Sequence, residues 1–495
     1  MSAGIFPRIL AGMAFAVLGT GTTVVASEAE VIRPPRCEGS VAAGTTMPTA
    51  ADPYPLMAAG WGPEAGKGLM ASRWAEDWSG MRAAGRAPAF KAMPLAGQAS
   101  LSLSAELRLR HDQFDNPLQN TGRDFARSLL RGVVGADLRF DETLRLFGEV
   151  ATGQVGGGPR AVGANFRNEA SLQQLFADVR SDAGPLLVGV MVGRQEFADG
   201  PRQLLSLGDG SNLHRSWNGI RGYVHGPRLR VGAFDLRATA LERGAFDDGV
   251  RSDERLQGIN ASFILGAGAG PNTYFEPFWY RTGKPDLRIG DSVGADDRDT
   301  FGARVWSRHG RLRHDWTLAV QRGRFDGRRV HAWGLFAVQS FELMENGWKP
   351  QLTAHVDIAS AGRADAAAAN GFNPLYASSG YLGEGQFLAL SNLLMVAPGF
   401  AIQPGATTRL TIEAGIARRL DASAPVLAGG LRAYPGTGEV GGHAIGSLLR
   451  AAATWSPTAR TTLSLNIEQL HAGAVLRSAG LASARYIAVG ATWRY

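Results

Sequence analysis

Arginine is the residue type in this sequence whose number and spacing most clearly point to binding chemistry. Of the 51 basic residues, only Lys67, Lys91, Lys284 and Lys349 are lysines, so 51 − 4 = 47 are arginines. A guanidinium offers a planar fork of donors that matches the oxygens of carboxylates and phosphates. A GC-rich genome also favours arginine codons, so composition alone leaves open whether these side chains bind anions.

Eight arginines are candidates for anion binding because they lie within segments where apolar and polar residues alternate. They are Arg108, Arg110, Arg131, Arg180, Arg194, Arg221, Arg304 and Arg409. An arginine facing lipid near the middle of a membrane costs about 2 to 4 kcal/mol. We therefore expect these side chains to face the polar side of their segments. Arg194 is ambiguous, because alternation places it beside Val190 and Val192.

Acidic residues on the same polar faces allow a second interpretation. Glu106, Asp137, Asp178 and Glu413 are candidate partners of the arginines. A fully paired set would form a neutral ladder that only solvates and stiffens a wall. Unpaired arginines would instead concentrate anions in a low-dielectric tube. Both interpretations stay open for each arginine, and we expect a net excess of positive charge on the polar side.

No pattern of residues predicts catalysis or metal binding. Nine histidines are present, but none recurs at a fixed spacing to a serine or aspartate. The acidic pairs Asp247-Asp248 and Asp296-Asp297 do not have the spacing of a calcium-binding loop. Gly156-Gly157-Gly158 lacks the Lys-Ser/Thr that follows a phosphate-binding loop. The sequence therefore predicts a protein that is not an enzyme and has no metal or cofactor.

Alternation with a period of two residues positions the arginines. From about Ala99 onward, leucines at 101, 103, 107 and 109 share one face with Ala105, while serines, Glu106 and arginines share the other. The same pattern recurs to the final segment, which ends in Trp493 and Tyr495. Such alternation is typical of strands, and about eighteen segments of this kind follow one another.

The hydropathy of the chain distinguishes a helical membrane protein from a membrane β-barrel. The chain has 495 residues, a mean hydropathy of -0.08 and 65 glycines. After the first thirty residues, no apolar run approaches the 18 or so residues that a membrane helix needs, so a helical bundle is excluded. Strands of about 9 to 11 residues with one apolar and one polar face are typical of a membrane β-barrel.

The connections between segments predict two different rims. Short connections such as 141–142 and 182–185 alternate with long ones such as 198–215, 282–298 and 361–386, and only 324–328 breaks the rule. Outer-membrane barrels have short periplasmic turns and long extracellular loops. We therefore expect an all-β fold, a transmembrane antiparallel barrel of about 18 strands with this orientation.

The N-terminal part divides into two regions before the barrel. Arg8, the apolar stretch 9–18 and Val24-Val25-Ala26 predict a signal peptide over residues 1–26. Residues 27–97 are aperiodic and are expected to form an irregular periplasmic or lumenal segment, and residues 98–495 the barrel. Cys37 is the single cysteine, so no internal disulfide forms. The signal peptide and the barrel together predict that the protein is located in the outer membrane of a Gram-negative bacterium.

Three groups of motifs resemble the alginate export family of outer-membrane proteins. The first is Arg73-Trp74-Ala75-Glu76-Asp77-Trp78, followed by Lys91-Ala92-Met93-Pro94-Leu95 and Gly97 before the first strand. The second is Gly193-Arg194-Gln195, Gly200-Pro201-Arg202-Gln203-Leu204 and Arg215-Ser216-Trp217-Asn218-Gly219. The third is Phe372-Asn373-Pro374-Leu375-Tyr376 with Gly380-Tyr381-Leu382-Gly383.

The resemblance implies an eighteen-stranded monomeric barrel with an arginine-rich constriction for anionic polyuronate chains. It also implies a lumenal role for Arg194, which a β-bulge would reconcile with the alternation. One feature departs from the family pattern. The alginate exporter is expected to have a long periplasmic loop late in the chain that plugs the lumen, whereas the last short connection here, 456–460, has room for no such plug.

The leading hypothesis is passive, anion-selective movement of acidic sugars, or of an alginate-like polysaccharide, across the outer membrane. The alternatives are a general diffusion porin for small solutes and a structural or adhesive barrel whose outer loops bind a partner. The expected partners are outer-membrane lipid, an anionic saccharide or another small anionic solute, and periplasmic secretion components. No nucleic acid is expected.

Overall fold

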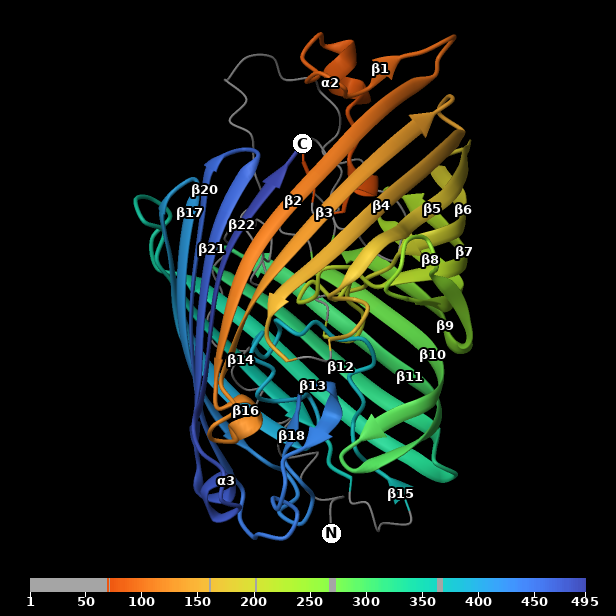
Figure 1. Ribbon diagram of the computed structural model, residues 1–495. Coiled ribbons are helices and arrows are strands. Elements are labelled where there is room, and N and C mark those ends of the chain that lie inside the picture. Colours follow the sequence, from red (N-terminus) through yellow and green to blue (C-terminus); the bar gives the residue numbers. More distant parts are fainter. Residues whose placement is uncertain (1–68, 71, 160–161, 201–202, 267–272, 363–367) are drawn as a thin grey trace.

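The computed structural model describes residues 69–70, 72–159, 162–200, 203–266, 273–362 and 368–495. Eighteen antiparallel strands of this part of the chain form one closed barrel, as the alternation predicts (Figure 1). The expected signal peptide at 1–26 lies outside the described residues.

Each barrel strand pairs with the next one along the chain, and the last pairs with the first. Residues Glu106–Asp115 of the first strand face Arg494–Arg485 of the last, which closes the barrel. The strands are β2 (Ser100–Asp115), β3 (Phe125–Arg139), β4 (Leu144–Gly157), β5 (Asn168–Ala183), β6 (Leu186–Glu196), β7 (Ser216–Gly226), β8 (Leu229–Ala240), β9 (Gly249–Leu265), β10 (Thr273–Ile289), β11 (Ser292–His309), β12 (Leu312–Phe325), β13 (Arg328–Glu342), β14 (Gln351–Ala359), β16 (Leu393–Gly405), β17 (Thr408–Arg418), β20 (Ala444–Thr458), β21 (Thr461–Ala472) and β22 (Ala484–Arg494).

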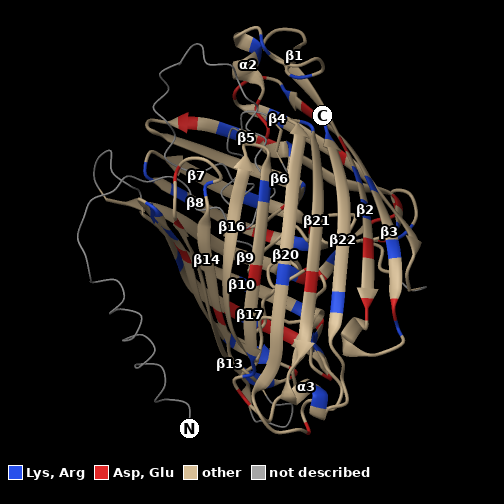
Figure 2. Cartoon of the chain, turned by 90° about the vertical axis from the view of Figure 1, so that its left-hand side faces the viewer, with Lys and Arg blue, Asp and Glu red and all other residues tan. Residues whose placement is uncertain are grey.

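The alternation in sequence becomes an alternation between outside and inside. On β2, Leu107 and Leu109 point outward and are 45% and 53% exposed, while Glu106 and Asp112 point inward and are buried. Because successive side chains of a strand lie on opposite faces, one leucine-rich face is left for lipid. Figure 2 shows the charged positions on β2 and β3 among the strands of the wall.

The two ends of the barrel differ in their connections, and we name them by this difference. The short-turn rim carries, among others, the turns 140–143, 184–185 and 459–460, and the long-loop rim carries the loops 197–215, 360–392 and 419–443. Near the short-turn rim lie η1 (Arg73–Ala75), α2 (Ser79–Ala83) and β1 (Met93–Pro94); the small elements of the loops are η2 (Pro117–Gln119), β15 (Ala368–Ala369), β18 (Leu427–Ala428), η3 (Gly429–Leu431), β19 (Arg432–Ala433) and α3 (Ala474–Ser478) (Figure 1).

The prediction of a long loop between β10 and β11 is wrong. Residues 282–298 are not a long connection: β10 and β11 continue through them and end in a two-residue turn at Gly290 and Asp291. Both faces are polar in this stretch, as the ion pair between Arg281 and Asp297 on the outer face illustrates. A strand that extends beyond the lipid loses its apolar face, and with it the pattern that identifies it in sequence.

The interior of the barrel is occupied by chain segments rather than empty. The loops 197–215 and 360–392 fold inward from the long-loop rim, where Leu205, Leu213 and Phe372 are at most 1% exposed (Figure 1). From the short-turn rim, the segment Ser72–Trp78 also enters, and Trp74 is 1% exposed. We call these three segments, together with the walls that they touch, the constriction of the lumen.

Candidate functional site: the constriction of the barrel

The walls β2 and β3 contribute a cluster of four inward-facing guanidinium groups. They belong to Arg108, Arg110, Arg127 and Arg131, and Arg108 lies directly opposite Arg131 in the strand pairing. Two carboxylates share this part of the wall, Glu106 and Asp112. The cluster therefore has two more positive than negative charges. Alternation predicts the inward direction of Arg108, Arg110 and Arg131.

Loop 197–215 covers this cluster with backbone carbonyl groups. Arg108 donates from Nη1 to the carbonyl oxygen of Asp209 at 2.9 Å and from Nη2 to that of Ser211. Arg110 donates to the carbonyl oxygen of Gly210 at 2.8 Å and forms an ion pair with Asp112 at 2.8 Å. Arg108 thus binds neutral oxygens in place of a carboxylate, so these hydrogen bonds leave its charge uncompensated.

Glu106 is the buried centre of an ion-pair group. It accepts hydrogen bonds from Arg73 at 2.8 Å and from Arg494 at 2.8 Å, and it also pairs with Arg131. Three arginines from the N-terminal segment, β3 and β22 therefore share one carboxylate. Such an arrangement satisfies the carboxylate oxygens while leaving net positive charge around it.

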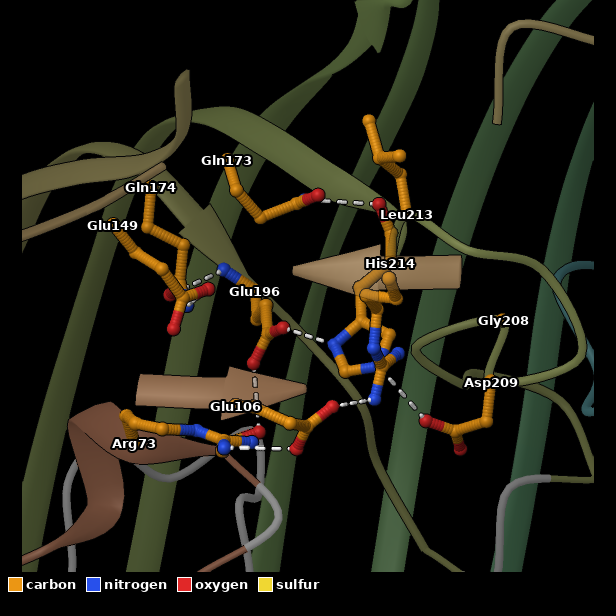
Figure 3. A network of polar contacts seen from close by, with 12 residues as sticks. Arg73, Glu106, Glu149, Gln173, Gln174, Glu196, Gly208, Asp209, Leu213 and His214 are labelled. Carbon is orange, nitrogen blue, oxygen red and sulfur yellow. Dashed lines mark hydrogen bonds and ion pairs between the residues drawn. The ribbon is translucent and has the colours of Figure 1, made fainter. Parts of the chain in front are cut away.

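His214 connects loop 197–215 to the same group, as Figure 3 shows. Its Nδ1 lies 2.5 Å from Oε1 of Glu196, and its Nε2 lies 3.2 Å from Oδ1 of Asp209 and 2.7 Å from Nη1 of Arg131. The other carboxylate oxygen of Glu196 accepts a 2.7 Å hydrogen bond from Ser72. The N-terminal segment and the loop thus meet at Glu196.

The charge on His214 depends on four opposing effects. Burial lowers the pKa of the imidazole, Glu196 raises it, Arg131 lowers it and a hydrogen bond to Asp209 raises it. The net effect places the pKa of His214 above its ordinary value. The protonated form therefore persists to higher pH than in a free imidazole, and in that form His214 holds the loop to Glu196 of the β6 wall.

Loop 360–392 attaches to the neighbouring wall, β21, through the end of the third motif. The carboxylate of Glu468 on β21 accepts hydrogen bonds from the backbone N–H groups of Glu384 and Gly385 at 2.8 and 2.9 Å. Gly383 has a φ of +129°, and a Cβ there would lie 2.4 Å from that carboxylate. A glycine is required because the backbone approaches the acid so closely.

The two inward loops contact each other near the middle of the lumen. The N–H of Ser206 donates to the carbonyl oxygen of Tyr376 at 3.0 Å, and Arg215 also donates to that oxygen at 3.0 Å. A Cβ at Gly210 would lie 2.3 Å from Oγ of Ser379. This contact joins the second and third sequence motifs into one constriction.

The other predicted arginines occupy different environments. Arg304 is buried and pairs with Glu276 at 2.8 Å and Asp315 at 2.5 Å, as the neutral-ladder interpretation expects. Arg221 is fully buried beneath the N-terminal segment. Arg180 and Arg409 lie on the inward faces of β5 and β17 near the short-turn rim.

Arg194 does not face the lumen. It lies on the same face of β6 as Val190 and Val192, which are 39% and 52% exposed, and its partner across the sheet is Asn218. The expected bulge is not there, because the pairing of β6 with β7 runs without a shift from Leu187 to Glu196. At the end of the strand, Arg194 instead donates to Oδ1 of Asn218 at 2.9 Å.

The predicted acidic partners are all inward, with different neighbours. Asp137 pairs with Arg145 at 2.6 Å and Arg139 at 3.2 Å. Asp178 accepts a hydrogen bond from the hydroxyl of Tyr223 at 2.8 Å. Glu413 pairs with His355 at 3.0 Å and Arg450 at 3.3 Å.

Sequence reasoning missed the residues of the N-terminal segment as part of the site. Arg73, Trp74 and Asp77 belong to the first family motif, but no periodicity assigns them a place. Arg139 and Arg145 were also missed, although both lie on the inward face by alternation. A cluster of charged and aromatic residues within an otherwise aperiodic stretch was the available signal.

Comparison with known families identifies the chain. The sequence matches the alginate export family over residues 99–490. The chain belongs to the alginate export family. Among curated protein sequences, none matches it. The motifs at 193–219 and 372–383, which lie within the matched region, form the constriction described above.

Solved structures of porins share the fold of this alginate export family member. OccAB1 of Acinetobacter baumannii aligns with a TM-score of 0.55 and 11% identity, covering 82% of this chain and 98% of that one. OpdK of Pseudomonas aeruginosa, solved with vanillate, aligns with a TM-score of 0.53 and 12% identity, covering 79% and 98%. OccK2 of the same organism, solved with glucuronate, aligns with a TM-score of 0.50 and 10% identity, covering 80% and 97%.

The family and the fold together place the protein in the outer membrane as a channel for solutes or polysaccharide. Its family and its structural neighbours are transport channels, a class distinct from enzymes. Among the described residues, no helix has the length and apolar character needed to span a bilayer.

Proposed function

We propose that this barrel is a passive, anion-selective channel for acidic sugars of short length, acting as a monomer. The observation that carries the proposal is that four arginines of β2 and β3, Arg108, Arg110, Arg127 and Arg131, face three carboxylates, Glu106 and Asp112 on these strands and Glu384 of loop 360–392, which leaves an excess of positive charge. In a narrow, low-dielectric lumen such an excess raises the local concentration of anions.

The size of the solute is inferred from the inward segments. Two loops and the N-terminal segment occupy the lumen, and they contact the walls through buried ion pairs and hydrogen bonds. A narrow lumen favours small solutes over a polymer chain. Glucuronate and vanillate, present in the structures of OccK2 and OpdK, are both small carboxylates and support this size class.

Planar-bilayer recording tests the proposal directly. Single channels in a KCl gradient should show a reversal potential on the anion-selective side. Arg108→Gln, Arg110→Gln and Arg131→Gln combined should reduce the anion-to-cation permeability ratio by about threefold or more. The matched control is Arg322→Gln, because Arg322 is exposed on the outer face of β12.

Three results would reject the proposal. Cation selectivity of the natural chain would contradict the charge argument. An unchanged permeability ratio in the triple variant would show that these arginines do not set selectivity. Complete absence of single-channel current from correctly folded barrels would support a structural role instead.

A further inference from the structure

The N-terminal segment Ser72–Trp78 contacts the wall of β3 and β4 mainly through acceptor oxygens. Nη2 of Arg145 donates to the carbonyl oxygen of Trp74 at 2.6 Å. Nη2 of Arg139 donates to the carbonyl oxygen of Glu76 at 3.0 Å, and Nη1 donates to the carboxylate of Asp77 at 2.7 Å. Two arginines of the wall are thus bound by three oxygens of the segment.

A third wall arginine lies under the ring of Trp74. The guanidinium of Arg221 on β7 is 5.3 Å from the centroid of this ring and is fully buried. Trp74 packs edge-on against Phe176, with Phe147, Met191 and Tyr223 in the same cluster. The segment therefore covers Arg139 and Arg145, whereas Arg221 lies between Trp74 of the segment and Phe197 of loop 197–215, 5.5 Å from the ring of Phe197.

The charges of Arg139 and Arg145 are balanced when the segment is present. These two arginines give two positive charges, and the wall carboxylate Asp137, which pairs with both, gives one negative charge. Asp77 of the segment supplies the remaining negative charge. Although burial works in the opposite direction, Arg139 and hydrogen bonds from Ser79 hold the pKa of Asp77 below its ordinary value. The carboxylate is therefore ionised.

The segment can leave without opening the barrel. The ring of strands closes between β2 and β22, and this closure does not involve residues 72–78. In the chain that follows the segment, α2 has no buried residue, but Lys91 is buried and pairs with Glu76 at 3.2 Å, and β1 pairs with β2. The contacts that hold the segment are thus its own polar contacts, the packing of Trp74 and the ion pair with Lys91.

We propose that residues 72–78 are a built-in competitor for an anion-binding patch formed by Arg139 and Arg145. When the segment is displaced, the patch takes the carboxylate and neighbouring hydroxyl oxygens of an acidic sugar. The backbone carbonyls and Asp77 occupy the positions of those oxygens in the closed state. The inference rests on the proposed anion channel, and it adds a solute site and the element that regulates access to it.

A reversible cross-link tests the competition. In a Cys37→Ser background, Ser72→Cys and Glu196→Cys place two thiols on residues whose side chains are hydrogen bonded at 2.7 Å. A short, reducible bis-methanethiosulfonate then fixes the segment, and glucuronate block of the KCl current is measured before and after reduction. The half-blocking concentration should be about tenfold higher in the cross-linked state, because the patch stays covered.

A charge substitution provides a second, independent variant. Asp77→Asn removes the carboxylate that balances the patch, so the half-blocking concentration of glucuronate should fall about threefold. The control is Asp141→Asn, since Asp141 lies on the same rim and accepts only backbone N–H groups of its own turn. Glucose should block neither variant.

The outcomes separate the two proposals. Equal glucuronate block in cross-linked and reduced channels, or equal behaviour of Asp77→Asn and Asp141→Asn, overturns the competitor while leaving an anion-selective channel in place. Absence of anion-selective current in every variant, including the natural chain, overturns the proposed function and the inference with it.

Discussion

The two walls of the lumen near the short-turn rim differ in the size of their inward side chains. On β4–β7 the inward positions include Phe147, Phe176 and Tyr223, all buried beneath the N-terminal segment. On β17–β22 most inward positions are small, namely Thr411, Ala452, Thr454, Ser464, Gly490 and Thr492, and Arg409 and Arg494 are the large inward residues there. Ser464 faces the lumen, because its neighbours Leu463 and Leu465 face outward. Its side chain is nevertheless exposed.

We infer from this difference that one barrel can hold a segment on one wall and pass solutes along another. Large aromatic residues and arginines bind the segment to β4–β7, and the small residues of β17–β22 take up less of the lumen. On β20, Arg450 donates to the carbonyl oxygens of Gly380 and Tyr381 in the constriction.

Filling the small-residue wall should have the largest effect. Thr454 and Ser464 face each other across β20 and β21, so Thr454→Trp with Ser464→Trp places two indoles in the route. Single-channel conductance should fall by about threefold or more. Leu465→Trp, on the outer face, should leave the conductance unchanged. Equal conductance in all three proteins would show that solutes do not pass along this wall.

Loosening the N-terminal segment from β4–β7 should have a smaller effect on the conductance, and in the opposite direction. Trp74→Ala removes packing worth on the order of 3 kcal/mol, a loss that falls on the docking of the segment rather than on the strand pairing. The conductance should rise about twofold, and a thiol at position 72 should become reactive toward a maleimide. Phe90→Ala is the control, because Phe90 is 57% exposed. A thiol that stays protected would mean that the segment docks without Trp74.

The attachment of loop 197–215 should weaken at high pH. The raised pKa of His214 means that its stabilising contribution is complete below about pH 6.5 and is lost as the pH rises through the folded pKa. The protection factors of residues 206–214, which correct for base-catalysed intrinsic exchange, should fall between neutral and alkaline pH. His214→Gln should abolish this fall in protection, whereas a fall that persists would assign it to another group.

The docking of the N-terminal segment on its wall should depend on pH in the sense opposite to that of loop 197–215. Because the pKa of Asp77 is lowered, its contribution is complete above about pH 4 and is lost as the pH falls through the folded pKa. Maleimide reacts with the thiolate, so labelling slows in acid at every site. The labelling of a thiol at position 72 relative to that of a thiol at the exposed position 90, compared at the same pH, should therefore increase in acid. The relative increase should be absent in Asp77→Asn, and a ratio that falls in acid would contradict the assignment.

The smallest effect is expected at one hydrogen bond of the other loop. The hydroxyl of Tyr381 donates to Asp357 at 2.6 Å. Tyr381→Phe should weaken the attachment of loop 360–392 by about 1 to 3 kcal/mol, detectable as faster hydrogen exchange of residues 378–386. Unchanged exchange would show that Arg450 and Glu468 suffice to hold this loop.

The barrel itself could be predicted from the sequence because lipid imposes a simple rule on every strand. Leu107 and Leu109 had to face outward, and Arg108 and Arg110 therefore had to face inward. Where the rule ceases, the prediction fails. The stretch 282–298 lies in strands with two polar faces, and Arg194 lies at a strand end where its guanidinium reaches Asn218 instead of lipid.

The constriction could be predicted only in part. Alternation places Arg108 in the lumen, but it cannot show that the partner is the carbonyl oxygen of Asp209, 101 residues along the chain. Likewise, Trp74 and Asp77 belong to a sequence motif, but the motif does not show where in the barrel they lie. Their positions follow from the closure of the barrel, which brings β3, β4 and β7 within reach of the N-terminal segment.

By itself, the sequence determined which side chains face lipid and which face the lumen, since the two-residue period and the cost of a charge in lipid leave no other arrangement. It also determined family membership, through three motifs in consistent order. Only the tertiary structure decided which charges remain uncompensated. That depends on which loop or segment lies against each guanidinium, and such contacts join residues that neither periodicity nor spacing relates.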